Sequence, residues 1–233
     1  MDKTVTTYLI DGDPKGTQYV FISNKICRTL DTVYRKQLKK NSNFANYMER
    51  KIKIMVGSTV YGFENELYQI VGLLQSMGYE VLNSHVGTIK VNPSLSNLEN
   101  CLNAVDECDI FFGIIRTYYG TGNIGNKNIA FEEIKRAIEQ GKPYWFMVHR
   151  DVVFARKLFG KIKGADKIEI NRNDFFDKRC IDVYNYVIKN EIAITQRTGN
   201  WVQEFYRIDD LLTYINTQFG DKSFVESILK QEE

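Results

Sequence analysis

The chain has 233 residues, of which 43% are hydrophobic and 13% are aromatic. That is enough apolar side chain for one well-buried core, which excludes an intrinsically disordered chain and a disulfide-stapled miniprotein. The formal net charge is only +2, from 31 basic and 29 acidic residues, so the overall composition carries no nucleic-acid signature. Any signal for a partner must therefore be local.

The charge is distributed unevenly along the chain. Residues 1–24 carry −1, residues 25–53 carry +7, residues 54–149 carry −4, and residues 150–233 carry zero. The basic character is thus confined to one segment near the N-terminus. A lysine-rich segment is most often a solvated helix face, so nucleic acid ranks last among the partners that we consider.

Cysteine usage and hydropathy point to the compartment. The four cysteines, Cys27, Cys101, Cys108 and Cys180, show no CxxC spacing, so we interpret them as reduced, mostly buried thiols rather than disulfides or a metal site. The chain has neither an apolar run of signal-peptide length at its start nor a window of about eighteen uninterrupted apolar residues. These features predict a cytoplasmic protein with no membrane partner and no metal, and nothing in the sequence calls for a cofactor.

Residues 1–49 are predicted to form an N-terminal extension. Two β-rich runs, TVTTYLI and TQYVFIS, surround the segment DGDPKG, whose proline and glycines supply turn geometry, so residues 4–23 are interpreted as a β-hairpin. Apolar residues at roughly helical intervals between Arg28 and Arg50 then predict a basic helix. We place the boundary to the next domain near Glu49.

From Lys51 onward, the pattern is that of an alternating α/β domain over residues 50–220. Short, mostly apolar runs alternate with amphipathic helical stretches: the runs are KIKIMVGS, YEVLNSH, DIFFGII, PYWFMVH and NWVQEF, and the helical stretches are YGFENELYQIVGLLQSMG, residues 97–108, AFEEIKRAIEQGK and DDLLTYINTQF. Short apolar strands separated by helices indicate a parallel sheet that is covered on both faces. The predicted fold is therefore a doubly wound α/β sheet of five strands.

Two further segments complete the predicted organisation. Residues 150–198 contain the basic stretch VVFARKLFGKIKGADK and a predicted helix from Phe175 to Lys189, and they form an insertion between the fourth and fifth strands. Residues 221–233 are expected to form a C-terminal tail helix.

Ligands of open parallel sheets bind in the crevice beyond the carboxyl ends of the strands. That rule nominates the residues that follow strands one and three and those that start the next helix, namely Gly57, Ser58, Thr59, Tyr61, Arg116, Tyr118, Glu132 and Glu133. A carboxylate below the anomeric carbon of a sugar stabilises an oxocarbenium-like transition state, so a glutamate among hydroxyls and aromatics favours N-glycoside cleavage. Either Glu133 or Glu132 can supply that anion.

Each of these residues also has a purely structural interpretation. An acidic residue near a helix start complements the helix dipole, which is enough to explain Glu132. The Gly-Ser-Thr segment after strand one can be an ordinary strand-to-helix turn, because the chain has neither a GxxxxGKS/T nor a GxGxxG motif. Arg116 suits a phosphate or a carboxylate, and it suits a salt bridge to Asp109 equally well. Tyr118 can stack on a base or simply pack.

Several sequence blocks together resemble a known family. The blocks are IMVGSTVYGFENE, NLENCLNAVDECDIFFGIIRTYYG, AFEEIKRAIEQGKP and RTGNWVQEF, and in this order they resemble the bacterial DUF4062 family, a domain of unknown function, over about residues 51–219. The resemblance implies a flavodoxin-like, TIR-like sheet with strand order 2-1-3-4-5. It also implies kinship with the nucleoside 2-deoxyribosyltransferases and a regulatory or defence-associated context.

The resemblance to deoxyribosyltransferases assigns roles to single residues. Glu133 matches their nucleophilic glutamate, eight residues before the glycine of a GK(P) turn at Gly141. Asp109 matches the aspartate that opens strand three and helps to position the sugar, and Tyr61 lies near the ligand-facing aromatic after strand one. The bulky stretch IKR after Glu133 departs from the small residues of that family and argues against a deoxyribonucleoside pocket. TIR domains use a glutamate to cleave NAD, so a dinucleotide remains a candidate substrate.

Two functions remain open at this point. The first is an N-glycosidase or glycosyltransferase acting on a nucleoside, nucleotide or NAD, with Glu133 as nucleophile or oxocarbenium stabiliser, Asp109 positioning the ribose and Arg116 holding a phosphate. The second is a non-catalytic TIR-like module that recognises a nucleotide, a protein partner or a second copy of itself, through residues 25–53 and 150–179. The orientation of the Glu133 carboxylate, into an open pocket or into a salt bridge, separates the two.

Overall fold

The computed structural model describes residues 50–230, apart from residues 121–122, 125–126 and 169–175. The chain divides into two units, Met1–Arg50 and Lys51–Glu233. The hairpin and helix expected in residues 1–49 lie outside the described residues, so the N-terminal extension stays a prediction. The second unit contains the α/β sheet.

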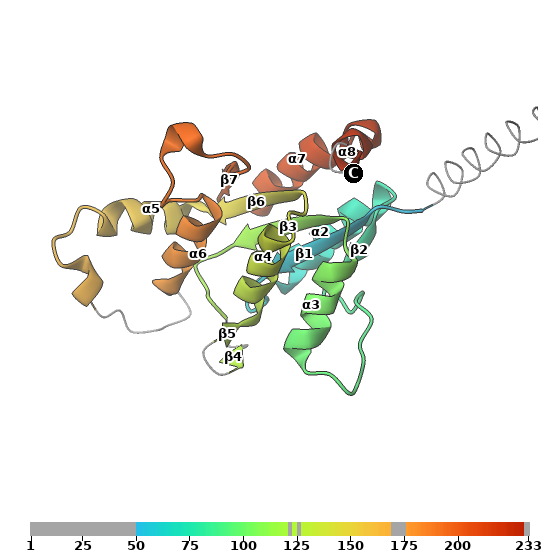
Figure 1. Ribbon diagram of the computed structural model, residues 1–233, viewed down its shortest axis with the longest axis horizontal. Helices are drawn as coiled ribbons and strands as arrows, with labels where there is room; N and C mark the ends of the chain where they lie inside the picture. The colour runs from blue at the N-terminus through green and yellow to red at the C-terminus, as the bar shows by residue number, and fades with distance from the viewer. Residues whose placement is uncertain (1–49, 121–122, 125–126, 169–175, 231–233) are drawn as a thin grey trace, which may run out of the picture. The chain divides into compact units, whose positions relative to one another are not determined.

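A five-stranded parallel sheet runs through the second unit (Figure 1). Its strands are, in chain order, β1 (Lys53–Ser58), β2 (Glu80–Leu82), β3 (Ile110–Ile115), β6 (Tyr144–His149) and β7 (Val202–Phe205). They lie in the order β2-β1-β3-β6-β7, and every neighbouring pair is parallel. Counting only the strands of this sheet, the order is the expected 2-1-3-4-5, so the doubly wound α/β fold is confirmed.

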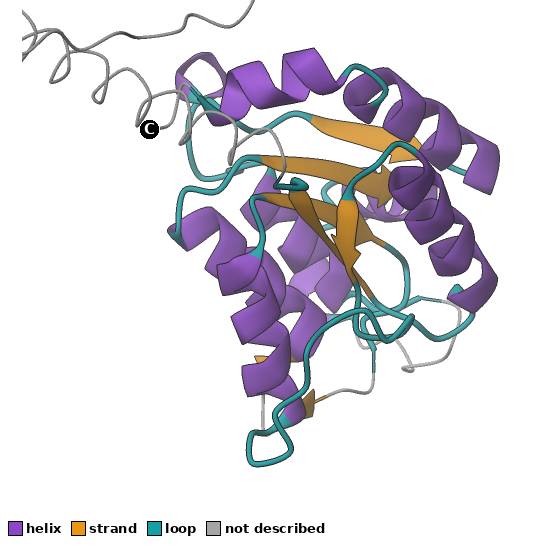
Figure 2. Cartoon of the chain, turned by 90° about the vertical axis from the view of Figure 1, so that its right-hand side faces the viewer, coloured by secondary structure: helices purple, strands orange, loops and turns teal. Residues whose placement is uncertain are grey.

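Helices connect the strands and cover both sides of the sheet (Figure 2). One face is packed by α2 (Glu64–Ser76), α7 (Ile208–Phe219) and α8 (Lys222–Leu229). The other face is packed by α3 (Asn97–Glu107), α4 (Ile129–Glu139), α5 (Arg150–Phe159) and α6 (Arg179–Val187). Two single 3-10 turns, Ala165–Lys167 and Ile194–Gln196, also lie between β6 and β7.

The central strand β3 explains why its sequence is apolar throughout. Ile110 and Phe112 belong to the core on the α2 and α7 side, whereas Phe111 and Ile115 belong to the core on the α3 and α4 side. All six residues of the strand are buried. Because each large apolar side chain stabilises the fold by about 1.5–3 kcal/mol on burial, a strand covered on both faces contains no polar residue.

The second strand is shorter than expected and ends at Leu82 rather than at His85. Asn83 ends it: its side-chain Nδ2 donates to the main-chain oxygen of Val56 at 2.9 Å, and its Oδ1 accepts from the main-chain nitrogen of Val86 at 2.9 Å. A buried amide that bonds across to β1 and forward along its own chain turns the backbone out of the sheet.

Two connections contain more structure than expected. The connection between β3 and α4 includes two antiparallel two-residue strands, β4 (Asn123–Ile124) and β5 (Lys127–Asn128). The basic stretch after β6 contributes most of α5, and the helix expected from Phe175 to Lys189 is α6, which runs from Arg179 to Val187.

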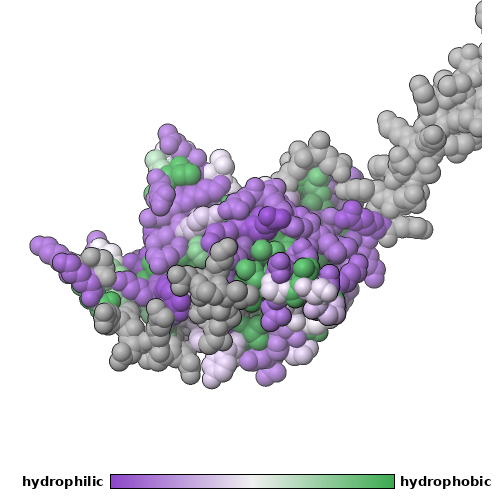
Figure 3. Space-filling view, turned by 60° about the horizontal axis from the view of Figure 1, so that its bottom comes forward, coloured by the Kyte–Doolittle hydropathy of each residue, from purple (hydrophilic) through white to green (hydrophobic). Residues whose placement is uncertain are grey.

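The surface of the described part gives no sign of a membrane span. None of its helices is long and apolar enough to cross a bilayer. On the face shown in Figure 3 the surface is largely hydrophilic, and hydrophobic residues gather only in small patches. Scattered exposed apolar residues are ordinary on proteins of this size.

Gly113 lies in the middle of β3, paired with Phe146 on β6, and a β-carbon at Gly113 would lie 2.2 Å from Cε1 of Phe146. We expect Gly113→Ala to lower the free energy of unfolding by about 1–3 kcal/mol, because a buried ring has to move. In Gly72→Ala nothing lies within 4 Å of the new β-carbon, so this helix variant should be neutral or up to about 1 kcal/mol more stable. Urea unfolding compares them, and equal stabilities would contradict the packing argument.

Candidate functional site

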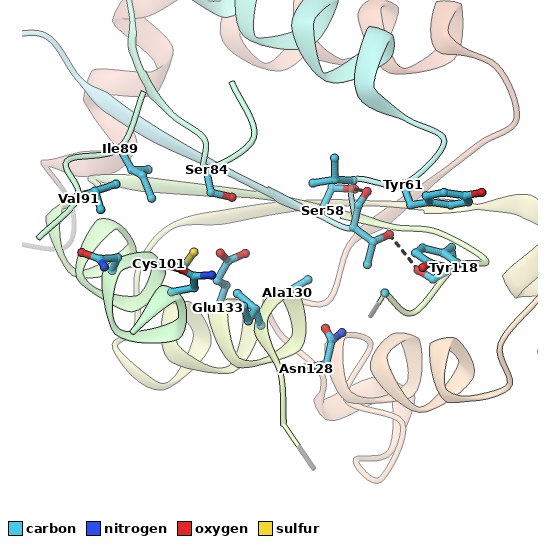
Figure 4. A pocket seen from close by; sticks show the side chains of 16 residues that line it. Ser58, Tyr61, Ser84, Ile89, Val91, Cys101, Tyr118, Asn128, Ala130 and Glu133 are labelled. Atoms are coloured by element: carbon cyan, nitrogen blue, oxygen red, sulfur yellow. Dashed lines mark hydrogen bonds between the residues drawn. The ribbon is translucent and has the colours of Figure 1, made fainter. Parts of the chain in front are cut away.

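A cavity of about 410 Å³ opens at the carboxyl ends of β1 and β3. It is lined by the end of β1 with the loop that follows it, the loop of residues 83–96, the start of α3, the loop after β3, and the start of α4 (Figure 4). This is the edge at which open parallel sheets bind ligands. The volume lies within the usual range of small-molecule sites.

The carboxylate of Glu133 points into this cavity from α4 (Figure 4). Only 4% of the residue is exposed. Asn128 begins the helix by accepting a hydrogen bond on its side-chain oxygen from the main-chain nitrogen of Phe131 at 3.0 Å. Gly57 lies directly beside the carboxylate, and glycine is required there by the ring of Phe111, because a β-carbon would lie 2.5 Å from Cζ of Phe111 and 3.4 Å from Oε2 of Glu133.

Burial raises the pKa of Glu133 from 4.5 to about 7. A side-chain hydrogen bond with Cys101 works against that rise, and the pKa of the Cys101 thiol is itself raised to about 12, first by burial and then by Glu133. No lysine, arginine or histidine is among the described residues that line the cavity. A buried carboxyl group without a cationic partner is costly for folding, and groups of this kind concentrate at functional sites.

Hydroxyl and amide groups surround the carboxylate. Ser58 and Ser84 lie on the same cavity as Glu133 (Figure 4). Asn100, which is only 4% exposed, fixes the neighbouring wall: its Oδ1 accepts from the main-chain nitrogen of Asn92 at 2.8 Å, and its Nδ2 donates to the main-chain oxygen of Asn92 at 3.2 Å. The loop of residues 83–96 is thereby held against α3, so this wall of the cavity is formed before a ligand binds.

Two tyrosines line the opening of the cavity. The ring centroids of Tyr61 and Tyr118 lie 5.2 Å apart with the planes tilted by 38°, and Tyr61 is 58% exposed. The hydroxyl of Thr59 donates to the main-chain oxygen of Tyr118 at 2.9 Å, which ties the loops after β1 and β3 together. Exposed aromatic rings at the opening of a polar cavity offer a stacking surface for a flat ring.

Arg116 supports the loop after β1 and does not enter the cavity. Its guanidinium donates to the main-chain oxygens of Thr59 at 3.0 Å, Tyr61 at 3.1 Å and Gly62 at 3.2 Å, and lies 4.4 Å from the ring centroid of Phe63. Burial lowers the pKa of Arg116. Three of the five guanidinium N–H groups are thus taken by main-chain carbonyls, which supports a structural role for Arg116, and the expectation that it holds a phosphate stays a prediction.

Asp109 lies at the opposite edge of the sheet from the cavity. Its Oδ2 accepts a hydrogen bond from the main-chain nitrogen of Lys53 at 2.8 Å. Lys53 is the first residue of β1 and Asp109 directly precedes β3, so the pair belongs to the amino ends of the strands. Glu133 is beside Gly57, near the carboxyl end of β1. The expectation that Asp109 positions a sugar beside Glu133 is therefore wrong for this geometry.

Glu132 takes the structural role that was weighed against a catalytic one. It forms an ion pair with Lys135 on the same helix, and the Lys135 ammonium lies 4.5 Å from the ring centroid of Phe131. Successive residues of a helix point about 100° apart, so Glu132 cannot share the orientation of Glu133. The structure thus places only one of the two candidate carboxylates in the cavity.

Of the residues nominated at the crevice, the structure brings Ser58, Thr59, Tyr61, Tyr118 and Glu133 to the cavity lining, with Gly57 directly beside Glu133. Sequence reasoning missed Ser84, Asn100 and Cys101 as lining residues. Asn100 offered a usable signal, since a polar amide on the inner face of an amphipathic helix must find a buried partner. Ser84 offered none, because its position depends on how the loop of residues 83–96 folds back.

The described residues contain no group of three or more His, Cys, Asp or Glu side chains that could hold a metal ion. The fold and the cavity define a doubly wound α/β protein with an open cavity at the carboxyl edge of its sheet. A family model described as "Domain of unknown function (DUF4062)" matches residues 53–199, well over half of the chain, and the protein belongs to this family.

The other two comparisons cover the curated proteins and the solved structures. A search of curated proteins finds no match. Among solved structures, the CMP N-glycosidase BcmB of Clostridium botulinum aligns with a TM-score of 0.38 and 11% sequence identity, covering 71% of this chain and 98% of that chain.

Glu133→Gln is expected to stabilise the fold at neutral and alkaline pH. The folded pKa of about 7 lies above the reference value of 4.5, so the folded chain binds more protons between these pH values. The free energy of unfolding of the wild-type protein therefore falls by up to about 3 kcal/mol as pH rises through that window. The variant does not lose this stability, because glutamine does not ionise. Urea unfolding at several pH values measures the gap, with Glu132→Gln as control. A gap that is constant from pH 4.5 to 7 would contradict the raised pKa.

Arg116→Met is expected to lower the free energy of unfolding by about 2 kcal/mol, because three main-chain carbonyls lose their donor. Arg136→Met is the matched control: Arg136 also makes a two-pronged contact, to Asp106, but both side chains are partly exposed, so its loss should cost less than about 1 kcal/mol. Thermal and urea unfolding compare the two. Indistinguishable losses would mean that Arg116 does not hold the loop after β1.

Proposed function

We propose that this protein is an N-glycosidase or glycosyltransferase acting on a nucleoside, nucleotide or NAD, with Glu133 as the reacting carboxylate. One observation carries the proposal: a buried carboxyl group, with no cationic side chain among the described cavity residues, points into an open cavity of about 410 Å³. A carboxylate in a merely structural role would be sealed by a salt bridge, as Glu132 is by Lys135. The open orientation supports the catalytic alternative.

The chemistry follows from where positive charge develops. When the bond between the anomeric carbon and the base nitrogen breaks, the base leaves with the bonding electron pair and the sugar becomes an oxocarbenium ion. The Glu133 carboxylate lies in a site of low dielectric, where its attraction for that cation is much stronger than in water. It either stabilises the ion until water or an acceptor adds, or forms a covalent ester with the anomeric carbon that the acceptor then opens.

The described lining favours the uncharged part of such a substrate. Serine hydroxyls near Glu133 suit the hydroxyls of a sugar, and the pair formed by Tyr61 and Tyr118 suits the base at the opening. Three donors of Arg116 are taken by main-chain carbonyls, and Arg116 is not among the residues that line the cavity. We therefore place the sugar and base of the substrate inside the cavity and any phosphate outside it.

A second function uses the same cavity without bond cleavage. With a pKa near 7, Glu133 is partly protonated at neutral pH, and a protonated carboxyl group can donate a hydrogen bond to a bound ligand. This property would serve a non-catalytic module that recognises a nucleotide. The docking surface predicted over residues 25–53 lies almost wholly outside the described residues.

Glu133→Gln is expected to reduce the release of free base from a susceptible nucleoside, nucleotide or NAD by about two to three orders of magnitude, because it removes the anion that faces the developing cation. Ligand affinity should change little. Chromatography of the reaction products measures release, and calorimetry measures binding. The wild-type rate should rise with pH and level off above about pH 7, since only the ionised carboxylate acts.

The control variant is Glu132→Gln, which removes the neighbouring carboxylate that lies outside the cavity. It should leave both release and binding unchanged. Binding without release of base by the wild-type protein would establish the recognition module instead. Release that survives in Glu133→Gln would remove Glu133 from the reaction.

A further inference from the structure

A second cavity, of about 530 Å³, opens where the amino ends of β6 and β7 meet α7. It is lined by four aromatic residues, Tyr144, Trp145, Trp201 and Tyr214, together with Gly199, Gln203, Thr217 and Gln218. It shares no lining residue with the cavity of Glu133, which opens at the carboxyl edge of the same sheet. The two cavities are therefore separate sites.

The strand register explains why aromatic residues converge here. Phe146 on β6 pairs with Val202 on β7, so the residues that precede them, Trp145 and Trp201, come to the same level of the sheet. Trp145 is fixed in place, because its ring packs on Phe219 at 5.2 Å between centroids. Trp201 is 75% exposed, so most of its surface is open to a ligand.

The polar groups of this cavity are neutral and include both donors and acceptors. Oε1 of Gln218 accepts a hydrogen bond from Nε1 of Trp145 at 3.2 Å. The NH2 group of Gln218 takes no part in this bond and can act as a donor. The hydroxyl of Thr217 donates to the main-chain oxygen of Thr213 at 3.0 Å, which leaves its oxygen as an acceptor. No charged side chain is among the described residues that line the cavity.

We propose that this aromatic cavity is a second ligand site that binds a neutral heteroaromatic ring, of the size and polarity of a free purine or pyrimidine base. Aromatic side chains provide stacking faces for such a ring, and each stacked base contributes substantially to affinity. The edge of a purine or pyrimidine ring carries a few hydrogen-bond donors and acceptors, which the glutamine and threonine side chains of the cavity can satisfy. A hexose would bring more hydroxyl groups than these few side chains can pair. No charged side chain lines the cavity to pair with an ionic ligand, and the nearby Lys189 ammonium, beside Gly199, donates to the main-chain oxygen of Thr198.

The protein's own tryptophans report on this site, because the chain has two tryptophans and both line this cavity. Free bases and uncharged monosaccharides are titrated separately into the full chain. Tryptophan emission is excited at the red edge of its absorption, where bases do not absorb. We expect saturable quenching by bases and none by monosaccharides. Glu133→Gln should respond like the wild-type protein, which separates this proposal from the proposed reaction.

Trp201→Ala should bind bases about tenfold more weakly, the loss expected for one base–aromatic stack, as followed by calorimetry and by the emission of Trp145. Gln203→Ala keeps both tryptophans and should also weaken binding, so the test does not depend on one variant. Tyr68→Ala is the matched control, since Tyr68 is an exposed aromatic (54%) that lines neither cavity. It should bind like the wild-type protein.

Four outcomes would overturn the assignment. Bases fail to quench saturably in the wild-type protein, or they bind Trp201→Ala and Gln203→Ala with undiminished affinity. Monosaccharides bind where bases do not, which would make the cavity a saccharide site. Light scattering shows self-association that is lost in Trp201→Ala while base binding is absent, which would make Trp201 a contact between copies of the chain.

Discussion

The burial of the Glu133 carboxyl group, without a cation to balance it, is the constraint on which the site depends. Only 4% of the residue is exposed, and its pKa is raised to about 7 because water is excluded from it. The surrounding structure accommodates this cost in several places. Gly57 lies directly beside the carboxylate, Asn128 begins the helix that carries it, and the Cys101 thiol shares a hydrogen bond with it. No lysine, arginine or histidine is among the described residues that line the cavity around it.

The sheet separates two chemically different surfaces. At its carboxyl edge, loops after β1 and β3 and the start of α4 form a cavity with an ionisable group at its centre. At its amino edge, Trp145 and Trp201 stand beside α7 around an uncharged cavity. Parallel strands place all their carboxyl ends together and all their amino ends together, so one sheet can support both surfaces without either disturbing the other.

Much of the architecture could be predicted from the sequence because burial on both faces leaves a direct mark on each strand. The run IFFGII in β3 is apolar at every position since each side chain meets a helix layer. The resemblance to deoxyribosyltransferases singled out Glu133 by its position before the turn at Gly141, and the structure puts this residue on the cavity at the carboxyl edge of the sheet. Asp109 was misplaced for a clear reason: resemblance assigned it a role, but a residue that opens a parallel strand lies at the edge opposite the carboxyl-end crevice.

The sequence alone predicts the doubly wound fold, the strands and helices to within a few residues, and the crevice at the carboxyl ends of the strands. These follow from periodicity, which is local. Only the tertiary structure decided which side chains meet there. Glu132 and Glu133 are neighbours in the chain, yet one pairs with Lys135 and the other enters the cavity because a helix turns each residue to a different side. Arg116 follows a strand at the correct edge, yet the loop after β1 engages it, because its position depends on how distant segments fold together.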